Sequence, residues 1–286
     1  MSSSFFGICP NDLTHFSTAP YVRNATRKGR DVELLVEARQ LSAVAPSGML
    51  FTAVNAAVRL GDVAVISGAA GMGPTALLLA LSGRFAITDG ALHTAGGKRA
   101  EAAQLRRRIT VAQALPVIQS EPTLRVAEAI AERRIIGGRK NVTAQAVWDA
   151  LAAMGSEAPP PNALVQEMGP LEQTLFALAL ARAQNTDGIC FDDIDGELAG
   201  ADRKFVREAV ASLASLGPAL IVTSRDPGWG TVDIILPAPR GTPAVPAGTD
   251  SGALAPQSDT EHGDVESAQN ADDEGTRPQD AGGEAP

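Results

Sequence analysis

The stretch that most constrains the fold is residues 63–81, VAVISGAAGMGPTALLLAL. It begins with five residues suited to a buried strand, passes through a glycine-rich turn and continues as a helix. Gly68, Gly71 and Gly73 fall where a phosphate-binding loop has its glycines, and Thr75 falls where such a loop presents a hydroxyl to Mg²⁺. Pro74 stands where that pattern has lysine. The stretch predicts a strand–loop–helix unit whose lysine position is altered.

Length and composition set the outer limits of the architecture. The chain has 286 residues, of which 44% are hydrophobic, which is enough for one sizeable domain with extensions or for two small domains. No apolar run in the sequence reaches the roughly 18 residues that a membrane-spanning helix needs. Cys9 and Cys190 are too few for a disulfide framework, and the amino terminus lacks a secretory signal pattern. We therefore expect a cytoplasmic chain.

The charge of the chain is concentrated in its last segment. Residues 241–286 contain ten acidic residues and one basic residue, so their net charge of −9 equals that of the whole chain. That segment has few large aliphatic residues and cannot bury enough surface to offset its ordering entropy. We expect an irregular leader over residues 1–31, a folded domain over 32–236 and a disordered acidic tail over 237–286.

Strand and helix patterns alternate through the folded domain. Strands are predicted at 32–41, 49–60, 63–67, 85–93, 108–111, 188–191, 219–223 and 234–236, and helices at 74–81, 123–134, 143–154, 171–184 and 202–216. Such alternation predicts an α/β fold with a mainly parallel sheet. The first two strands flank a turn at Pro46, Ser47 and Gly48 and form an antiparallel β subdomain. Residues 115–170 contain helices without strands, so we expect a separate helical arm.

The order of these segments resembles the nucleotide-binding domain of the ABC (ATP-binding cassette) transporter family. The segments VRLGDVAVISG, RRRITVAQ, TLRVAEAI, ALALARA, ICFDD and ALIVTS follow one another in the order and at about the spacing of that family. The resemblance covers roughly 200 residues, about 34–236. It implies a P-loop NTPase fold of the ABC type, with ATP and Mg²⁺ as ligands.

The resemblance assigns roles to individual residues. The nucleotide-binding positions are Gly68, Ala69, Ala70, Gly71, Met72, Gly73, Pro74 at the lysine position, Thr75, Ala76 and Gln113. Thr75, Gln113 and the Walker B residue Asp192 would hold Mg²⁺. Asp193 takes the place of the catalytic glutamate, and Ser224 takes that of the switch histidine. Asp193 is one methylene shorter than glutamate, which sets its carboxylate back from an attacking water.

Several residues depart from the family pattern, and all of them bear on the same ligand. Pro74 supplies neither the cation nor the N–H that a lysine offers to phosphate. The signature sequence Leu-Ser-Gly-Gly-Gln is replaced by residues 170–174, Pro-Leu-Glu-Gln-Thr, which puts Glu172 where the family has a glycine. Ala45 occupies the position of the adenine-stacking aromatic, with Phe51 nearby as an expected core residue. Weak or absent ATP binding and hydrolysis is the prediction.

Basic residues gather around the predicted helical arm. They are Arg106, Arg107, Arg108, Arg133, Arg134, Arg139 and Lys140. Such a run is usually a solvated face, and the alternative is a docking surface for an acidic partner or for lipid headgroups. Nucleic acid is not expected, because aromatic residues are not interleaved with the basic ones.

Three functions remain open from the sequence. The first is a degenerate ABC subunit, associated with a multi-span membrane protein or with a second cassette subunit, possible as a dimer, at the inner face of the membrane. The second is a slow but functional ABC ATPase that uses Thr75, Gln113, Asp192 and Asp193 to energise transport. The third is a non-catalytic adaptor that acts through its leader, basic arm and acidic tail.

Overall fold

The computed structural model describes residues 21–24, 32–46, 48–68, 71, 73–136 and 142–237, and for residues 21–24 only the backbone. All of these residues belong to one unit, Met1–Thr242, and the second unit, Pro243–Pro286, lies outside the described residues. The prediction of a disordered tail, and that of an irregular leader over residues 1–20 and 25–31, also fall outside the described residues.

Among the described residues, six strands form the main sheet, all parallel except β1 at one edge. In spatial order they are β1 (Tyr21–Asn24), β10 (Val232–Ile235), β4 (Val63–Ser67), β9 (Ala219–Thr223), β8 (Gly188–Phe191) and β7 (Ile109–Gln113). Strands β4, β8 and β9 have the bounds that the sequence predicts, and all of their residues are buried. Continuous apolar runs of this kind are typical of parallel strands that are covered on both faces.

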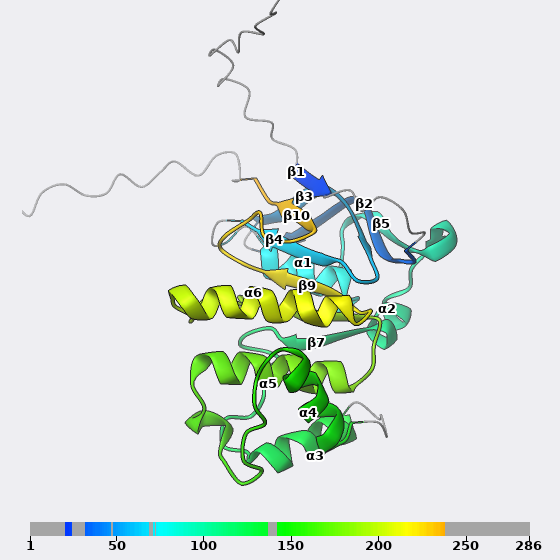
Figure 1. Ribbon diagram of the computed structural model, residues 1–286. Helices are drawn as coiled ribbons and strands as arrows, with labels where there is room; N and C mark the ends of the chain where they lie inside the picture. Colours follow the sequence, from blue (N-terminus) through cyan, green and yellow to red (C-terminus); the bar gives the residue numbers. More distant parts are fainter. Residues whose placement is uncertain are drawn as a thin grey trace, which may run out of the picture. The chain divides into compact units, whose positions relative to one another are not determined.

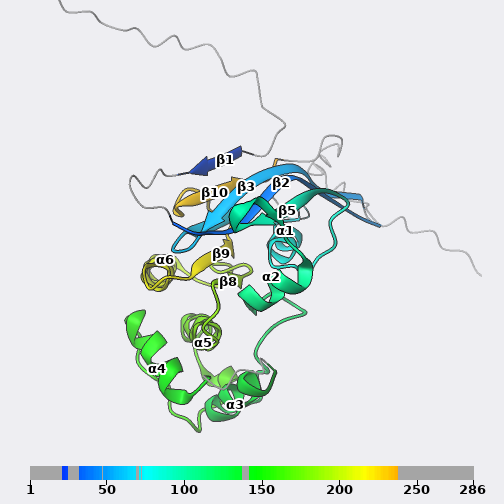
Figure 2. The ribbon, with the colours of Figure 1, turned by 90° about the vertical axis from the view of Figure 1, so that its right-hand side faces the viewer.

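The two faces of the main sheet pack into two different hydrophobic clusters. Side chains alternate along β4, so that Ala64 and Ile66 join one cluster while Val63 and Val65 join the other. The first cluster contains α1 (Pro74–Leu81) and α2 (Ala102–Arg108), and the second contains α5 (Pro170–Ala183) and α6 (Gly200–Ser215). Figures 1 and 2 show these helix pairs on opposite sides of β8 and β9.

An antiparallel sheet covers the α1 side of the molecule. Its strand order is β3 (Gly48–Arg59), β2 (Leu34–Ala45), β5 (Asp89–Thr94) and β6 (Lys98–Arg99). Apolar residues of β2 and β3 pack in the same cluster as α1, which therefore lies between the two sheets (Figure 2). The predicted antiparallel β subdomain and the reversal near residues 46–48 are confirmed, with Ala45 paired to Gly48.

The helical arm consists of α3 (Val126–Ile136), α4 (Ala144–Ala153) and the short 3₁₀ helix η2 (Val165–Glu167). Its apolar residues Val126, Val147 and Leu151 belong to the same cluster as Phe176 of α5 and Phe191 of β8. The arm therefore shares its hydrophobic core with the main sheet, and in this respect it is not separate. Thr143 caps α4, as predicted, by accepting the N–H of Ala146 at 3.2 Å.

Four local predictions are corrected by the structure. Tyr21–Asn24, expected to be irregular, forms β1 because it pairs with β10 from the far end of the domain. The predicted strand 85–93 is formed only from Asp89, and α3 begins at Val126 rather than at Thr123. The helix α2 was not predicted, since Leu105 is its one buried residue and its seven residues show no apolar periodicity.

The predicted basic cluster does not form a single feature of the arm. Arg106, Arg107 and Arg108 end α2, which packs beside β7 and not on the arm. Arg108 pairs with Asp187 at 2.6 Å and with Glu33 at 2.9 Å, so its charge is largely balanced. Arg133 and Arg134 do lie on α3, whereas Arg139 and Lys140 lie outside the described residues.

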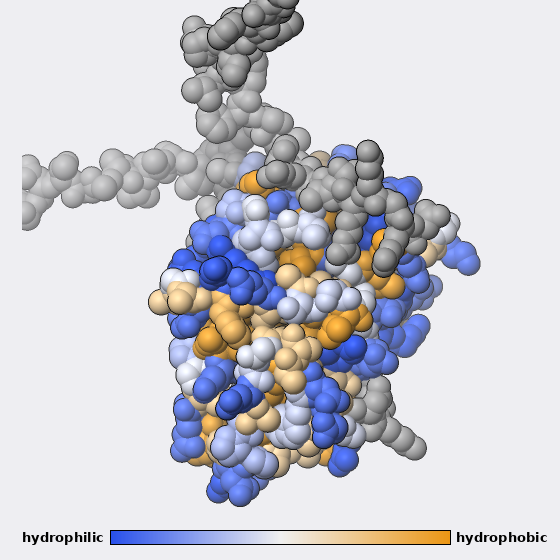
Figure 3. Space-filling view, in the orientation of Figure 1, coloured by the Kyte–Doolittle hydropathy of each residue, from blue (hydrophilic) through white to orange (hydrophobic). Residues whose placement is uncertain are grey.

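The surface of the described part of the chain combines hydrophilic and apolar residues. Figure 3 shows hydrophilic residues around apolar areas that cross the middle of this face, at the height of α5 and α6 in Figure 1. No helix among the described residues is long and apolar enough to span a bilayer.

Cys190 is a free thiol in the middle of β8 and is completely buried, as expected of a core residue. Burial raises the pKa of this thiol to about 12, because the charged form is poorly solvated there. In a Cys9→Ser variant we expect the remaining thiol to resist a disulfide reagent at pH 8 and to react completely after unfolding in guanidinium chloride. Reaction of the native protein at the rate of a free thiol would contradict its burial.

Candidate functional site

The glycine-rich loop lies between β4 and α1, and three of its positions are described. Ala69, Ala70 and Met72 lie outside the described residues. Gly73 has a φ of 73°, and a Cβ there would come within 2.9 Å of the Leu50 carbonyl oxygen in β3. Only glycine suits this backbone and this close approach. Pro74 follows as the first residue of α1, where its fixed φ favours helix initiation.

Asp192 is the centre of a small hydrogen-bonded cluster at the carboxyl end of β8. Its side chain is buried, with 6% of the residue exposed. The Thr75 hydroxyl donates to the two carboxylate oxygens at 3.0 and 2.9 Å, and the Thr223 hydroxyl donates to Oδ1 at 2.6 Å. The Asp192 cluster, Thr75, Asp192 and Thr223, therefore ties α1 to the ends of β8 and β9. Two of the residues predicted to hold Mg²⁺ lie side by side in it.

Asp193, at the position of the catalytic acid, is turned toward solvent. Its φ of 49° is in the left-handed region, and its N–H donates to the Thr223 hydroxyl at 2.6 Å. The carboxylate is 44% exposed and lies 3.6 Å from the guanidinium of Arg225. An exposed pair of this kind contributes about 0–1 kcal/mol, so it orients Asp193 weakly.

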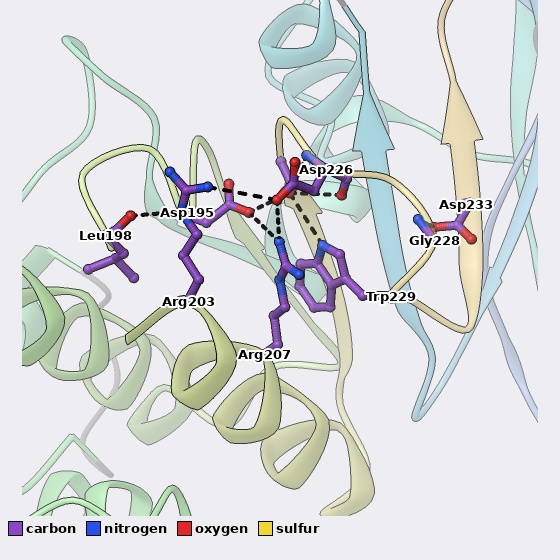
Figure 4. A network of polar contacts seen from close by, with 9 residues as sticks. Asp195, Leu198, Arg203, Arg207, Asp226, Gly228, Trp229 and Asp233 are labelled. Carbon is purple, nitrogen blue, oxygen red and sulfur yellow. Dashed lines mark hydrogen bonds and ion pairs between the residues drawn. The ribbon is translucent and has the colours of Figure 1, made fainter. Parts of the chain in front are cut away.

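Ser224, at the position of the switch histidine, is buried in the loop that follows β9. Its hydroxyl donates to Asp195 at 2.7 Å and accepts the N–H of Asp226 at 3.1 Å and that of the Trp229 indole at 3.3 Å. Asp195 follows β8, whereas Asp226 and Trp229 follow β9, and Figure 4 shows these three residues close together. The Ser224 hydroxyl therefore makes all of its hydrogen bonds within the protein, and these bonds hold the loop after β9 in place.

A buried ion pair completes this arrangement. Asp195 is only 2% exposed, and the Arg207 guanidinium of α6 lies 3.1 Å from it and 2.8 Å from Asp226 (Figure 4). Desolvation lowers the pKa of Arg207, but its hydrogen bonds to Asp226 and Asp195 outweigh that effect and raise the pKa. The same guanidinium stacks over Trp229, 5.4 Å from the ring centroid. We call Asp195, Arg207, Asp226 and Trp229 the α6 network.

Gln113 lies between the Asp192 cluster and the arm. Its backbone carbonyl accepts the N–H of Asp192 at 3.0 Å, so its main chain adjoins the Asp192 cluster. The residue also lines a cavity of about 150 Å³ on the arm side, together with Gln166 and Gln173. Among the described contacts, no hydrogen bond joins its amide to Thr75 or Asp192.

The segment at the signature position forms the first turn of α5. Glu172 accepts the N–H of Gly169 at 3.1 Å and so satisfies the N-cap N–H at the amino end of this helix. The Gln173 amide donates to the Met168 carbonyl at 2.9 Å. A carboxylate of the same chain therefore occupies the amino end of α5, where an anion would otherwise bind.

The two residues considered for adenine stacking lie in the β2–β3 hairpin. Ala45 ends β2 and is half-buried, and Phe51 is 4% exposed within the cluster around α1. The expectation that Phe51 is a core residue is confirmed.

Mg²⁺ and a nucleotide phosphate make different demands on these residues. The Thr75 hydroxyl and the Asp192 carboxylate are oxygen donors of the type that Mg²⁺ prefers. Among the described residues, however, no three His, Cys, Asp or Glu side chains come together to hold a metal ion. At the lysine position of the phosphate loop, Pro74 offers neither a cation nor an N–H. The described residues therefore suit Mg²⁺ in part, and Pro74 is the one loop residue among them that does not suit a phosphate.

Three important residues were not identified from the sequence. Thr223 was predicted only as the end of a strand, although it binds both Asp192 and Asp193. Asp195 and Arg207 were not singled out, because they are twelve positions apart and meet only after α6 packs on the sheet. A run of three acids at 192, 193 and 195 after a buried strand was the one available indication.

Comparison with solved structures identifies proteins of similar fold. The chain is similar to MJ1267, an ATP-binding cassette of an ABC transporter in its ADP conformation, with a TM-score of 0.56 and 16% identity over 68% of this chain and 83% of that one. It is similar to CbiO1 from Clostridium perfringens, described as part of the ABC transporter complex CbiONQ, with a TM-score of 0.55 and 15% identity over 68% and 79% of the two chains.

A third similar structure is dimeric MJ0796, a bacterial ABC transporter cassette, with a TM-score of 0.55 and 17% identity over 67% of this chain and 88% of that one. No family model matches the sequence. No curated protein matches it. The chain thus has the fold of an ABC-type ATP-binding cassette, which confirms the resemblance at the level of fold.

Proposed function

We propose that the chain is a cassette-type subunit that binds Mg-ATP weakly or not at all, has little or no hydrolytic activity and works by associating with another protein. The observation that carries this proposal is Pro74 at the first position of α1. A phosphate-binding loop depends on a cation at that position and on several backbone N–H donors, and proline removes the cation and one of the donors. Glu172 at the signature position supports the proposal, because its carboxylate repels phosphate.

The proposed association takes its support from the similar structures. CbiO1 is described as part of a transporter complex, and MJ0796 is described as dimeric. By analogy we propose that this chain associates with a multi-span membrane protein or with a second cassette subunit, on the cytoplasmic side of a membrane. That analogy rests on similarity of fold and on nothing else.

The test is calorimetric titration of the intact chain with Mg-ATP. We expect the wild type to bind with a Kd weaker than about 1 mM, and Pro74→Lys to bind at least about tenfold more tightly, because a charge-assisted contact contributes roughly 1.5 to 3 kcal/mol. Pro74→Gln is the matched control, since it restores the N–H without a charge. Micromolar binding by the wild type, unchanged in Pro74→Lys, would refute the proposal.

A slow ATPase is the second candidate, and the Asp192 cluster favours it. Thr75 and Asp192 lie within hydrogen-bond distance, as the ligands of a magnesium site should. This function requires phosphate release from Mg-ATP that Asp192→Ala abolishes. If the purified chain releases phosphate no faster than the Asp192→Ala variant, the ATPase is excluded.

A further inference from the structure

A cavity at the base of the arm shares only Glu172 with the proposed nucleotide chemistry. It has a volume of about 340 Å³ and lies between the end of α4, the segment 156–163, η2 and the start of α5. Its walls include the buried side chains of Leu151, Met168 and Phe176. Pro159 and Pro160 stiffen one side, because their φ angles are fixed. The cavity therefore has buried apolar side chains in its walls and a rigid segment on one side.

Three glutamates contribute to the lining of this cavity. They are Glu157, Glu167 and Glu172. Glu167 accepts the N–H of Leu164 at 3.2 Å and Glu172 accepts that of Gly169 at 3.1 Å. Within the described part of the chain, none of the three lies within ion-pair distance of a lysine or arginine. The cavity thus combines buried apolar side chains with three carboxylates that no described cation pairs with.

The sequence around the cavity explains its charge. Between Val142 and Ala181 the chain has four acidic residues, Asp149, Glu157, Glu167 and Glu172, and no basic one. This stretch of the sequence is therefore acidic, and the basic residue Arg125 of the preceding segment meets it at the Asn162 carbonyl, to which it donates at 2.7 Å. A partner must bring the positive charge, and anionic lipid headgroups would be repelled.

Within the described part of the chain, no lysine or arginine lines the cavity. A basic segment of another molecule is therefore the occupant that its glutamates favour.

We propose that this cavity docks a cationic, apolar segment of a partner protein. An arginine or lysine whose methylene groups enter the cavity would place its charge among Glu157, Glu167 and Glu172, as long basic side chains do at apolar surfaces. Neighbouring aliphatic side chains of the segment contact Leu151, Met168 and Phe176. The proposal names the surface for the association proposed above and rests on it, but it does not depend on whether the chain binds ATP.

The probe is the blocked hexapeptide acetyl-LRLRLR-amide, titrated into the intact chain and followed by ¹⁵N chemical shifts. We expect saturable shifts in the cavity residues, and about tenfold weaker binding by the Glu157→Gln/Glu167→Gln/Glu172→Gln variant. Glutamine keeps the capping contacts of Glu167 and Glu172, so the fold is preserved. The matched control is Glu121→Gln/Glu128→Gln/Glu132→Gln, which makes the same change of charge around α3 and should bind as the wild type does.

Two further peptides separate charge from apolar contact. The same hexapeptide with citrulline for arginine keeps the shape without the charge, and acetyl-GRGRGR-amide keeps the charge without the leucines. Both should bind at least about tenfold more weakly than the first probe. Equal binding of the citrulline peptide, or equal weakening by the two glutamine variants, would overturn the proposal. Failure here leaves the Mg-ATP titration unaffected, so the two proposals fail separately.

Other occupants would give different results. If the chain's own residues fill the cavity, Arg139→Gln/Lys140→Gln should bind the probe about tenfold more tightly than the wild type. If a second copy fills it, sedimentation should show a dimer that the cavity variant dissociates. Either result would overturn the assignment to a different partner protein.

Discussion

Replacing Arg207 by methionine is expected to lower the free energy of unfolding by about 3 kcal/mol, the lower end of the cost of removing one partner from a buried ion pair. Asp195 is 2% exposed and would keep its negative charge without the guanidinium, while Ser224 alone would still donate to it. We expect a cost at the lower end of that range because the Arg207 side chain is itself 28% exposed. Urea unfolding followed by tryptophan fluorescence measures the change.

Arg203→Met is the matched control for this prediction. Arg203 lies one turn earlier on α6, donates to the Leu198 carbonyl at 2.7 Å and is 3.8 Å from the exposed Asp226 carboxylate. Its loss should cost about 1 kcal/mol. Adding Asp195→Asn to Arg207→Met should recover part of the stability, since it removes the unpaired charge. Equal costs for Arg207→Met and Arg203→Met would show that Asp195 does not depend on Arg207.

Phe176→Ala should cost about 3–5 kcal/mol, because it deletes a large side chain that is 1% exposed in the core shared by the arm and the main sheet. Phe205→Ala on α6 is the control, and it should cost less because Phe205 is only partly buried. Urea unfolding of each variant gives the two values.

The Phe176→Ala variant also tests whether the arm and the main sheet unfold together. The chain has two tryptophans, Trp148 on α4 and Trp229 after β9. Variants in which one of them is replaced by phenylalanine let the other report on the arm or on the α6 network. In Phe176→Ala both reporters should show one transition at the same urea concentration. An earlier transition at Trp148 would show that the arm is an independent unit.

The strands of the main sheet could be predicted from the sequence because they are continuous apolar runs bounded by turns. β8 and β9 have the predicted bounds for this reason. The four residues of β1 could not be predicted, because they become a strand only by pairing with β10, more than 200 positions later. The register of such pairs depends on tertiary packing rather than on local pattern.

The candidate site was predictable where its residues end a strand or begin a helix. Thr75 and Asp192 were located in this way, and the structure brings them within hydrogen-bond distance. The partners of Ser224 were not predictable, because Arg207 resembles any charged residue on a surface helix until α6 packs against the loop. Arg106, Arg107 and Arg108 were wrongly grouped with the arm, because proximity in the sequence does not place arginines on one surface.

The Asp192 cluster has a consequence for how such sequences are interpreted. Thr75 and Asp192 keep the family's residue types, and the Thr75 hydroxyl donates to the buried Asp192 carboxylate. Gly73 also keeps its type, where a side chain would collide with β3. These residues would persist in a chain that never meets a nucleotide, because losing them would weaken the fold. A motif search that finds these three residues therefore detects residues that the fold itself requires. The residue at the lysine position is the better indicator of ATP binding.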